Sequence, residues 1–306
     1  MNSISFASLF DLLDSNPTEQ DCINYLEKTI WKEKVVSPHD PTSEIYKCTG
    51  NKYKCKNTGK YFTARSLTIF RNSNLPLKKW FLALSFFASQ RISSCQFAKH
   101  IKVTQKTAWF IEHRLRFIFE NPAFKTKLGN SVEIDEAFLG GSNLNRHWNK
   151  KAPKTQGRNW KDKIPVLGMI EQNGNLICQV VPDTKRETLE PIIRDNIEAG
   201  TNVCTDEWLA YNNLGEWFNH QIVNHRKKQY VNGKTTTNRV ENAWSHLKRS
   251  VYGTYFKVSK QHSQAYIKEF TFRFNTRKYS MQERFDLALS LSVGKRLTYR
   301  GLVGVN

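Results

Sequence analysis

The chain has 306 residues, and its 47 Lys and Arg against 27 Asp and Glu give a formal net charge of +20 at pH 7. An excess of this size attracts polyanions over the whole surface, which argues against an ordinary metabolic enzyme. The competing interpretation is a basic but inert surface. With 39% hydrophobic and 12% aromatic residues, the chain has enough apolar material for packed cores, which argues against wholesale disorder.

Neither a membrane span nor a secretory signal is visible in the sequence. The most apolar run, Trp80 to Ala88, is far shorter than the ~20 residues that a transmembrane helix needs. The N-terminus lacks a basic region and carries Asp11 and Asp14. The 6 cysteines are scattered, unlike those of a disulfide scaffold. We therefore expect an intracellular, cytoplasmic protein with reduced thiols and no membrane partner.

The first part of the chain combines a short helix with a loop-rich stretch. In this stretch Pro, Gly and Asn separate short segments that contain Tyr and Phe, which predicts a small β-ribbon. From Leu77 to about Glu120, apolar residues recur at helical spacing, and three helices fit this span.

The next part, from about residue 126 to 280, mixes strands and helices. It opens with an apolar, β-branched strand, SVEIDEAFLGG, and Asn173-Gly174 between two apolar runs predicts a hairpin. A helix closed by Gly200, two further strands and a long helix from about Asn238 to Ser250 follow. The predicted order, β-β-β-α-β-α-β-α, is that of an RNase H-like core, an open mixed sheet flanked by helices.

Three carboxylates come from separate elements of this part. Asp135 lies in the first strand, Asp206 ends a later strand, and Glu241 starts the long helix. Metal-dependent phosphoryl transfer needs two or three carboxylates that converge at one end of a sheet. The competing interpretation is that an Asp at a strand end only forms a turn, and three neighbours are rival ligands. These are Glu133, Glu136 and Glu207.

Glu241 is the only acidic residue between Glu216 and Glu269, a segment rich in Lys and Arg. One carboxylate kept among so many cations suggests a required metal ligand. The alternative is a capping box with Asn238 as the N-cap. Lys248 lies seven residues later, on the same helix face, where it could hold a DNA phosphate or simply be solvated. The predicted buried stripe of this helix consists of Val240, Trp244, Leu247 and Val251.

Several runs together resemble the insertion-sequence DDE transposases with an ISXO-like catalytic domain. They are VEIDEAFLGG, NRHWNKKAPKTQGRNWKDKIPVLGMIE, VCTDEWLAY and TNRVENAWSHLKRSVYGTYFKVSKQHSQAYIKEFTFRFNTRK. The resemblance implies that Asp135, Asp206 and Glu241 are the catalytic, metal-binding triad, and that Lys248 is the lysine that follows the glutamate by seven residues. It implies two Mg²⁺ ions, with Mn²⁺ as a possible substitute.

The function implied by the resemblance is that of a transposase. Such an enzyme binds the terminal inverted repeats of its element and catalyses Mg²⁺-dependent strand cleavage and strand transfer. Its partners would be double-stranded DNA, both transposon ends and target, and further copies of itself in a synaptic complex. A bacterial protein of this kind would associate with the nucleoid when bound to DNA. Two alternatives stay open: a catalytically decayed, sequence-specific DNA-binding protein, and an RNase H-like nuclease or resolvase.

The segment SSCQFAKHIKVTQKTAWFIEHRLR resembles a helix-turn-helix, with Ser94 to His100 as the first helix and Thr104 to Arg116 as the recognition helix. Thr104 is the expected N-cap. Lys102 replaces the usual turn glycine, at a cost of ~1 kcal/mol if the position is left-handed. The alternative is a plain helical hairpin. The residues of this segment that we expect to bind DNA are Gln105, Lys106, Thr107, Arg114 and Arg116.

Relatives typically begin with a zinc ribbon that has paired CxxC knuckles, and this chain has none. Cys48 and Cys55 are too few thiolates for tetrahedral zinc, because Cys22 lies far upstream. We therefore expect a small, degenerate zinc-ribbon-like region without zinc, although a three-cysteine site completed by His39 is an alternative. The aromatic residues expected to form its replacement core are Tyr46, Tyr53, Tyr61 and Phe62.

A basic stretch from Arg146 to Lys163 contains two tryptophans, Trp148 and Trp160. Such a loop could track a DNA backbone and stack on an unpaired base, whereas a solvated loop would explain the charges but not the tryptophans. Outside the helix-turn-helix, the expected DNA contacts are Lys150, Lys151, Arg158, Arg239 and Arg249. In the helix near the C-terminus, helical spacing favours core positions for Tyr266, Phe270 and Phe274.

These observations predict a mixed α/β protein in four parts. Residues 1–76 form the N-terminal helix and zinc-free ribbon, and residues 77–125 form the helix-turn-helix domain. Residues 126–282 form the RNase H-like DDE catalytic domain, and residues 283–306 form a C-terminal helix and tail.

Overall fold

A computed structural model describes residues 11, 14–120, 126–140, 147–151, 163–223 and 237–304. Its contacts divide the chain into two compact units, residues Met1–Glu120 with Thr276–Asn306, and residues Asn121–Asn275. None of the helices in these described ranges is long and apolar enough to cross a membrane. The mixed α/β class predicted from the sequence is confirmed.

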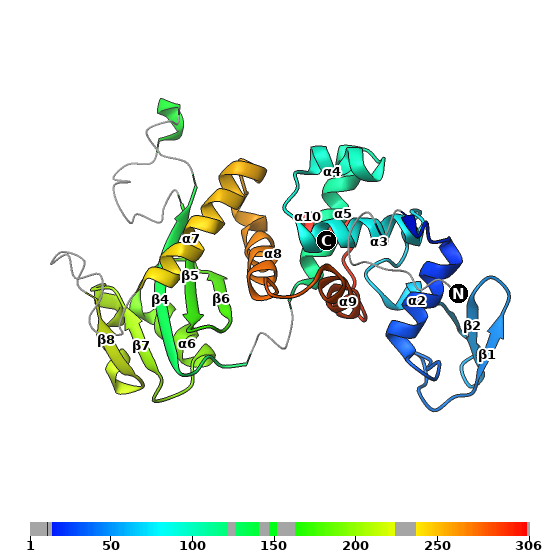
Figure 1. The fold of residues 1–306 in the computed structure, drawn as a ribbon, viewed down its shortest axis with the longest axis horizontal. Coiled ribbons are helices and arrows are strands. Elements are labelled where there is room, and N and C mark those ends of the chain that lie inside the picture. Colours follow the sequence, from blue (N-terminus) through cyan, green and yellow to red (C-terminus); the bar gives the residue numbers. More distant parts are fainter. Residues whose placement is uncertain are drawn as a thin grey trace. The chain divides into compact units, whose positions relative to one another are not determined.

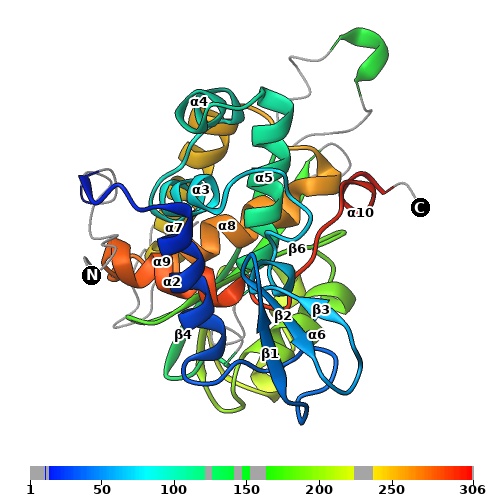
Figure 2. The ribbon, with the colours of Figure 1, turned by 90° about the vertical axis from the view of Figure 1, so that its right-hand side faces the viewer.

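In the described part of the first unit, a helix precedes a three-stranded antiparallel sheet in the order β1-β2-β3 (Figure 2). A capping box starts the helix: the Thr18 side chain accepts from the Asp21 amide, and the Asp21 side chain accepts from the Thr18 amide. The elements are α2 (Glu19–Trp31), β1 (Ile45–Cys48), β2 (Lys52–Cys55) and β3 (Tyr61–Phe62).

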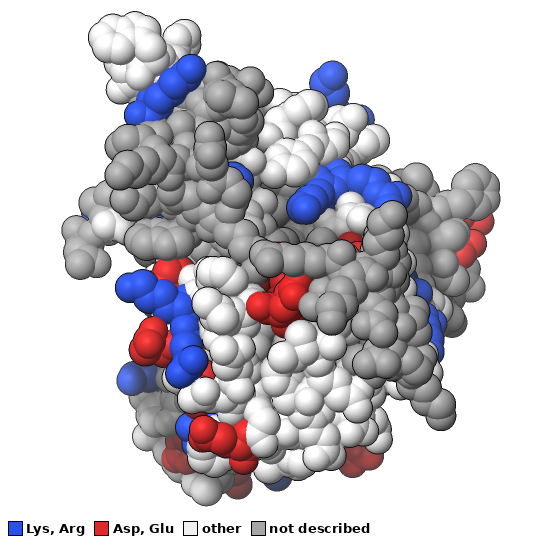
Figure 3. All heavy atoms as spheres, turned by 90° about the vertical axis from the view of Figure 1, so that its left-hand side faces the viewer, with Lys and Arg blue, Asp and Glu red and all other residues white. Residues whose placement is uncertain are grey.

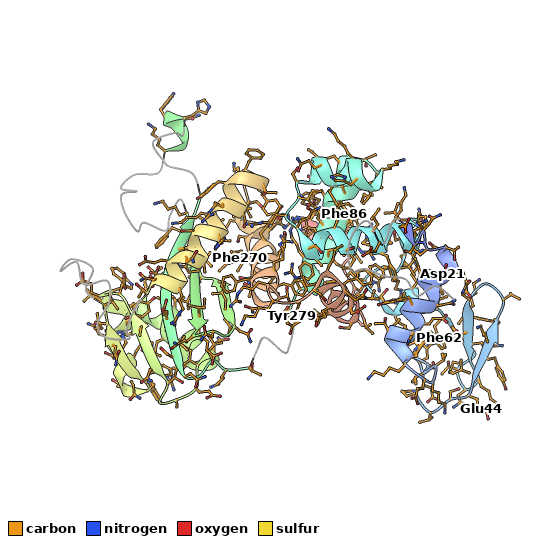
Figure 4. All side chains as sticks on the ribbon, in the orientation of Figure 1. Asp21, Glu44, Phe62, Phe86, Phe270 and Tyr279 are labelled. Carbon is orange, nitrogen blue, oxygen red and sulfur yellow. The ribbon has the colours of Figure 1, made fainter. Side chains whose placement is uncertain are left out.

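This sheet buries only one face, and Trp31 of α2 covers it. Tyr53 and Phe62 are buried there, with their rings 5.1 and 6.1 Å from the Trp31 ring; Phe62 is labelled in Figure 4. Tyr46 and Tyr61 are 49% and 59% exposed, so their predicted place in the ribbon core is wrong. The reason is that successive strand residues point to opposite faces, and no second layer of described residues covers the other face.

The helices of the first unit come from both ends of the chain. Besides α2, the described α-helices of this unit are α3 (Leu77–Ser89), α4 (Ser94–Ile101), α5 (Gln105–Ile118), α9 (Met281–Leu291) and α10 (Tyr299–Val303). Rings from α2, α3 and α9 meet in its core, because Phe285 lies 6.1 Å from Tyr25 and 5.3 Å from Phe81. The C-terminal helices thus pack into the same unit as the N-terminal ones. The predicted four-part division of the chain stays a prediction.

The second unit is built on a five-stranded sheet in the order β6-β5-β4-β7-β8. Central strand β4 is antiparallel to β5 and parallel to β7. The predicted hairpin is confirmed, because Asn173 adopts a positive φ of 60° between β5 and β6. The strands are β4 (Ser131–Leu139), β5 (Ile164–Glu171), β6 (Leu176–Val180), β7 (Asn202–Thr205) and β8 (Asn219–Ile222).

Helices cover both faces of this sheet. On one face, Leu189 and Ile193 of α6 (Arg186–Asn196) pack on Val132 and Ile134 of β4 in one core cluster. On the other face, α7 (Asn238–Ser250) and α8 (Ser263–Asn275) pack over β4, β5 and β6 (Figure 1). Phe270 of α8, labelled in Figure 4, is buried in this second cluster. The predicted buried stripe of α7 is confirmed.

One predicted helix is absent from the described residues. Between β7 and β8 the chain forms two short 3₁₀ turns, Leu209–Tyr211 and Leu214–Glu216, where the predicted order has an α-helix. Tyr211 and Leu214 from these turns are buried in the same core cluster as α6, so short turns suffice to cover this part of the sheet. The last strand, β8, begins at Asn219, two residues before the predicted QIVNHR, and ends at Ile222; residues 224–226 of the predicted strand lie outside the described residues.

Candidate active site

A pocket of about 440 Å³ on the second unit contains the predicted carboxylates. Asp135, Asp206 and Glu241 line it from three separate elements, and Lys248 lines it as well. Its other lining residues are Glu136, Phe138, Thr237, Trp244 and Ser245. The space-filling view shows a group of acidic side chains in a hollow near its centre, with Lys and Arg side chains close by (Figure 3).

Strand pairing explains why the two aspartates are neighbours. In the parallel pair of β4 and β7, Glu133 lies beside Cys204. Asp135 and Asp206 each come two residues later in their strands' direction, so the two aspartates lie close together where the pairing of β4 with β7 ends. Asp206 also forms a turn, because its Oδ1 accepts a hydrogen bond of 3.0 Å from the Trp208 amide. Asp206 therefore both forms the turn and lines the pocket.

Asp135 faces α7. Its Oδ2 accepts a hydrogen bond of 3.0 Å from Trp244 Nε1. Alternation along β4 places Glu133 on the same side of the sheet, while Ile134 points into the core beneath α6. This side of β4 therefore contacts the helix that carries Glu241.

Glu241 is exposed in the early part of α7, and it accepts a hydrogen bond of 3.2 Å from Thr237 Oγ1. The alternative capping box is wrong, since the N-cap is Thr237, and its side chain makes no capping bond. Glu133 satisfies the helix amides instead. Its Oε2 accepts from the amides of Arg239 at 2.8 Å and Val240 at 3.1 Å. A carboxylate at this position also suits the positive end of the helix dipole.

The three rival carboxylates take different places. Glu133 is 1% exposed, and burial raises its pKa although the two helix amides act against the shift. Glu136 is 8% exposed, lines the pocket and accepts a 2.6 Å hydrogen bond from Tyr211. Burial and the neighbouring Glu136 carboxylate raise the pKa of Tyr211 well above its usual value. Glu207 is exposed and does not line the pocket.

The donor chemistry of the pocket suits a hard divalent cation. Asp135, Glu136, Asp206 and Glu241 supply carboxylate oxygens, which Mg²⁺ and Mn²⁺ prefer. Within the described ranges, however, no three or more His, Cys, Asp and Glu side chains are grouped so that they could hold a metal ion. These carboxylates therefore share a pocket without forming a preassembled metal cage.

Three expected DNA contacts lie at the start of α5. Gln105 and Lys106 are exposed, Thr107 is half-buried, and the Thr104 side chain caps the helix through the Thr107 amide as predicted. Gln105 Nε2 donates to Ser94 Oγ of α4 at 2.8 Å. Lys106 Nζ lies 5.8 Å from the centre of the Tyr299 ring of α10.

Arg114 and Arg116 do not fit the expected DNA contacts. Arg114 is 5% exposed, donates to the carbonyls of Ile69 and Arg71, and lies 5.0 Å from the Trp80 ring. Arg116 is 0% exposed and pairs with Glu112 at 3.3 Å. The reason is that the C-terminal half of α5 is buried on nearly every side within the first unit, so we correct their expected role to structural cations.

The remaining expected DNA contacts differ in how exposed they are. Arg239 is half-buried and pairs with Glu133 at 3.5 Å, whereas Arg249 and Lys151 are exposed. Of Lys150 only the backbone is described, and Arg158 lies outside the described residues, as do Trp160 and most of the basic stretch.

Sequence reasoning missed that Trp244 and Tyr211 hydrogen-bond to carboxylates of the pocket. Trp244 was expected only in the core, yet it also lines the pocket and binds Asp135. Tyr211 holds Glu136 from a turn that was not foreseen. Both roles depend on contacts between distant segments, although Gly168 within an apolar strand was a signal that another group approaches the backbone closely.

Comparison with known proteins fits these observations. Residues 127–275 match the ISXO2-like transposase domain. A protein of Halobacterium salinarum, described as an uncharacterized protein in transposable element ISH50, is 27% identical over 270 residues, or 84% of this chain and 90% of the relative. An uncharacterized transposase-like protein of Haemophilus influenzae is 32% identical over 109 residues, 34% of this chain and 83% of the relative. No solved structure matches the chain.

A mixed α/β unit with an acidic pocket on a basic protein is typical of the class of proteins that act on a polyanion. The chain belongs to the insertion-sequence transposases with an ISXO2-like transposase domain. Membership of this family implies DNA as its partner.

Proposed function

We propose that the protein is an active transposase that binds the terminal inverted repeats of its element and catalyses divalent-metal-dependent cleavage and strand transfer. The observation that carries this proposal is the pocket in which Asp135, Asp206 and Glu241 meet from β4, the end of β7 and α7. Carboxylates from separate elements at one end of a sheet are the arrangement that metal-dependent phosphoryl transfer requires.

In this proposal Asp135, Asp206 and Glu241 hold the metal, Mg²⁺ or Mn²⁺. When bound, the metal lowers the pKa of water or of a DNA 3′-hydroxyl and stabilises charge on the leaving oxygen. Lys248, on the same pocket wall, holds a phosphate of the bound strand. Cleavage and strand transfer use the same site, because both are displacements at phosphorus that need positioning and charge stabilisation rather than a covalent intermediate.

The topology of the second unit supports an RNase H-like core. Its central strand β4 has the antiparallel strand β5 on one side and the parallel strand β7 on the other, and helices cover both faces. The α4–α5 pair supports a helix-turn-helix in which Gln105, Lys106 and Thr107 face the DNA, since its turn residue Lys102 is left-handed and Thr104 caps the second helix. The ribbon that precedes it is proposed to bind no zinc.

A second candidate is a decayed transposase that binds DNA without cutting it. The observation in its favour is that the described residues contain no preassembled group of three metal ligands. An active enzyme requires these carboxylates to approach one another when metal binds, whereas a decayed copy does not.

The test is Mg²⁺-dependent cleavage of duplex DNA that carries the terminal inverted repeats, taken from the DNA that flanks the coding region. Asp135→Asn, Asp206→Asn and Glu241→Gln should each lower the cleavage rate about a hundredfold or more, while DNA binding in EDTA persists. Glu207→Gln is the matched control, because Glu207 is exposed outside the pocket. Undiminished cleavage by Asp135→Asn would reject the site, and binding without cleavage by the wild type would favour the decayed enzyme. Preferential cutting of four-way junctions would indicate a resolvase.

A further inference from the structure

The indole of Trp244 lies directly on a strand backbone. Trp244 is 4% exposed, and its Nε1 donates to Asp135 Oδ2 at 3.0 Å. On the neighbouring strand β5, Gly168 is the register partner of Asp135. A Cβ built on Gly168 would overlap Cη2 of the Trp244 indole and lie only 2.5 Å from its Cζ2. Any residue other than glycine would therefore push the indole away from its place beside Asp135.

We propose that Trp244 is a positioning residue for the Asp135 carboxylate, and that Gly168 is required because it makes room for the indole. This inference rests on the proposed function, since it concerns how one proposed metal ligand is held. Trp244 itself touches neither metal nor DNA in this proposal. It acts by fixing the rotation of the Asp135 carboxylate, which binds the metal.

The physical basis is the donor chemistry of tryptophan. The indole N–H is a donor only, and a buried donor must find an acceptor, so its hydrogen bond fixes the orientation of the Asp135 carboxylate. Partners that orient a metal ligand in this way are worth ~10-fold to 100-fold in metal affinity or activity. A role in packing alone would require only an apolar side chain in the stripe formed with Val240 and Leu247, and it would not explain a hydrogen bond to a pocket carboxylate.

Two substitutions separate the hydrogen bond from the packing. Trp244→Phe keeps an aromatic ring but removes the N–H, and Gly168→Ala keeps the N–H but displaces the ring. Each should lower the cleavage rate ~10-fold to 100-fold and raise the Mn²⁺ concentration needed for half-maximal cleavage, with end-DNA binding in EDTA unchanged. Gly215→Ala is the matched control, because nothing lies within 4 Å of the Cβ built there.

The double variant adds a readout that simple packing loss would not produce. Phe lacks the two indole atoms that would collide with the methyl group introduced by Gly168→Ala. Gly168→Ala should therefore cost little once Trp244→Phe is present, so the two effects should not add. Additive losses, or a lower melting temperature with unchanged Mn²⁺ dependence, would overturn the proposal.

A measurement on the wild-type chain covers the case in which the variants fail to fold. The indole N–H resonance of Trp244 should shift when Mg²⁺ is added, and the shift should vanish in Asp135→Asn. No shift in a wild type that cleaves DNA would overturn the positioning role while the proposed function survives. If Asp135→Asn cleaves like the wild type, the proposed function itself fails.

Discussion

Glu133 connects the central strand of the large sheet to the helix that carries Glu241. Its buried carboxylate accepts from the amides of Arg239 and Val240 and pairs with the Arg239 guanidinium. A side chain from β4 thus satisfies amides that have no acceptor within α7 and fixes where this helix begins. The position of Glu241 relative to Asp135 therefore depends on a residue that does not line the pocket.

Glu133→Ala should destabilise the second unit by about 1 to 2 kcal/mol, because two helix amides lose their acceptor. The urea midpoint of unfolding, followed by circular dichroism, measures this loss. Glu190→Ala is the control, since Glu190 forms only a partly exposed pair with Arg194 at 4.0 Å. Equal destabilisation by the two variants would contradict the capping role.

His220 gives the second unit a pH-dependent stability. Its Nε2 lies 2.8 Å from Thr205 Oγ1, and burial lowers its pKa below the usual 6.5. The unfolded chain then binds a proton more readily than the folded one, so stability is lost as the pH falls through 6.5. The melting temperature of the wild type should fall relative to His220→Gln as the pH is lowered from about 7.5 to about 5.5. A constant difference between the two proteins would contradict the shift.

At the scale of elements, the α4–α5 turn has a residue that does not suit its backbone. Lys102 adopts φ 52° and ψ 62°, a left-handed conformation that costs a side chain about 1 kcal/mol. Lys102→Gly should therefore raise stability by up to about 1 kcal/mol in thermal unfolding. Lys102→Ala removes the same charge but keeps the strain, so it should bring no such gain. Equal gains in stability from both variants would show that the lost charge, and not the backbone strain, causes the effect.

Local signals predicted several elements correctly. The Thr104 cap, the Asn173-Gly174 hairpin and the buried stripe of α7 follow from spacing over a few residues, and all three are observed. The start of α7 at Asn238 was also predicted, but the group that caps it was not, because Glu133 comes from a distant strand. Helical spacing also could not show that Arg114 and Arg116 face the core, where carbonyls and Glu112 pair with them.

At the scale of the whole molecule, the sequence predicted each pocket carboxylate on its own element. That the two aspartates lie in one pocket depends on the parallel pairing of β4 and β7. The sequence did not predict that the C-terminal helices pack into the first unit, because local patterns relate a segment only to its neighbours along the chain. One consequence is that Tyr299 of α10 lies beside Lys106, a proposed DNA contact.

The net charge of +20 predicts strongly salt-dependent DNA binding. Lys106→Gln should reduce the slope of log affinity against log salt by about 1, as expected for one lost phosphate contact. Filter binding or fluorescence anisotropy over a salt series measures the slope. Arg194→Gln is the control for the loss of one positive charge. It should leave the slope unchanged, because the Arg194 guanidinium stacks on Trp217, 3.6 Å from the ring centre, and is not a proposed DNA contact. An unchanged slope for Lys106→Gln would remove Lys106 from the DNA-binding surface.

The most direct test of the central claim, that Asp135, Asp206 and Glu241 form one metal site, is a crystal structure of the full chain grown with Mn²⁺ and measured at the manganese absorption edge. The account predicts an anomalous peak within about 2.2 Å of carboxylate oxygens of both Asp135 and Asp206, on the side of the pocket that faces Glu241. Manganese bound elsewhere on the chain, with no peak at these two aspartates, would contradict it.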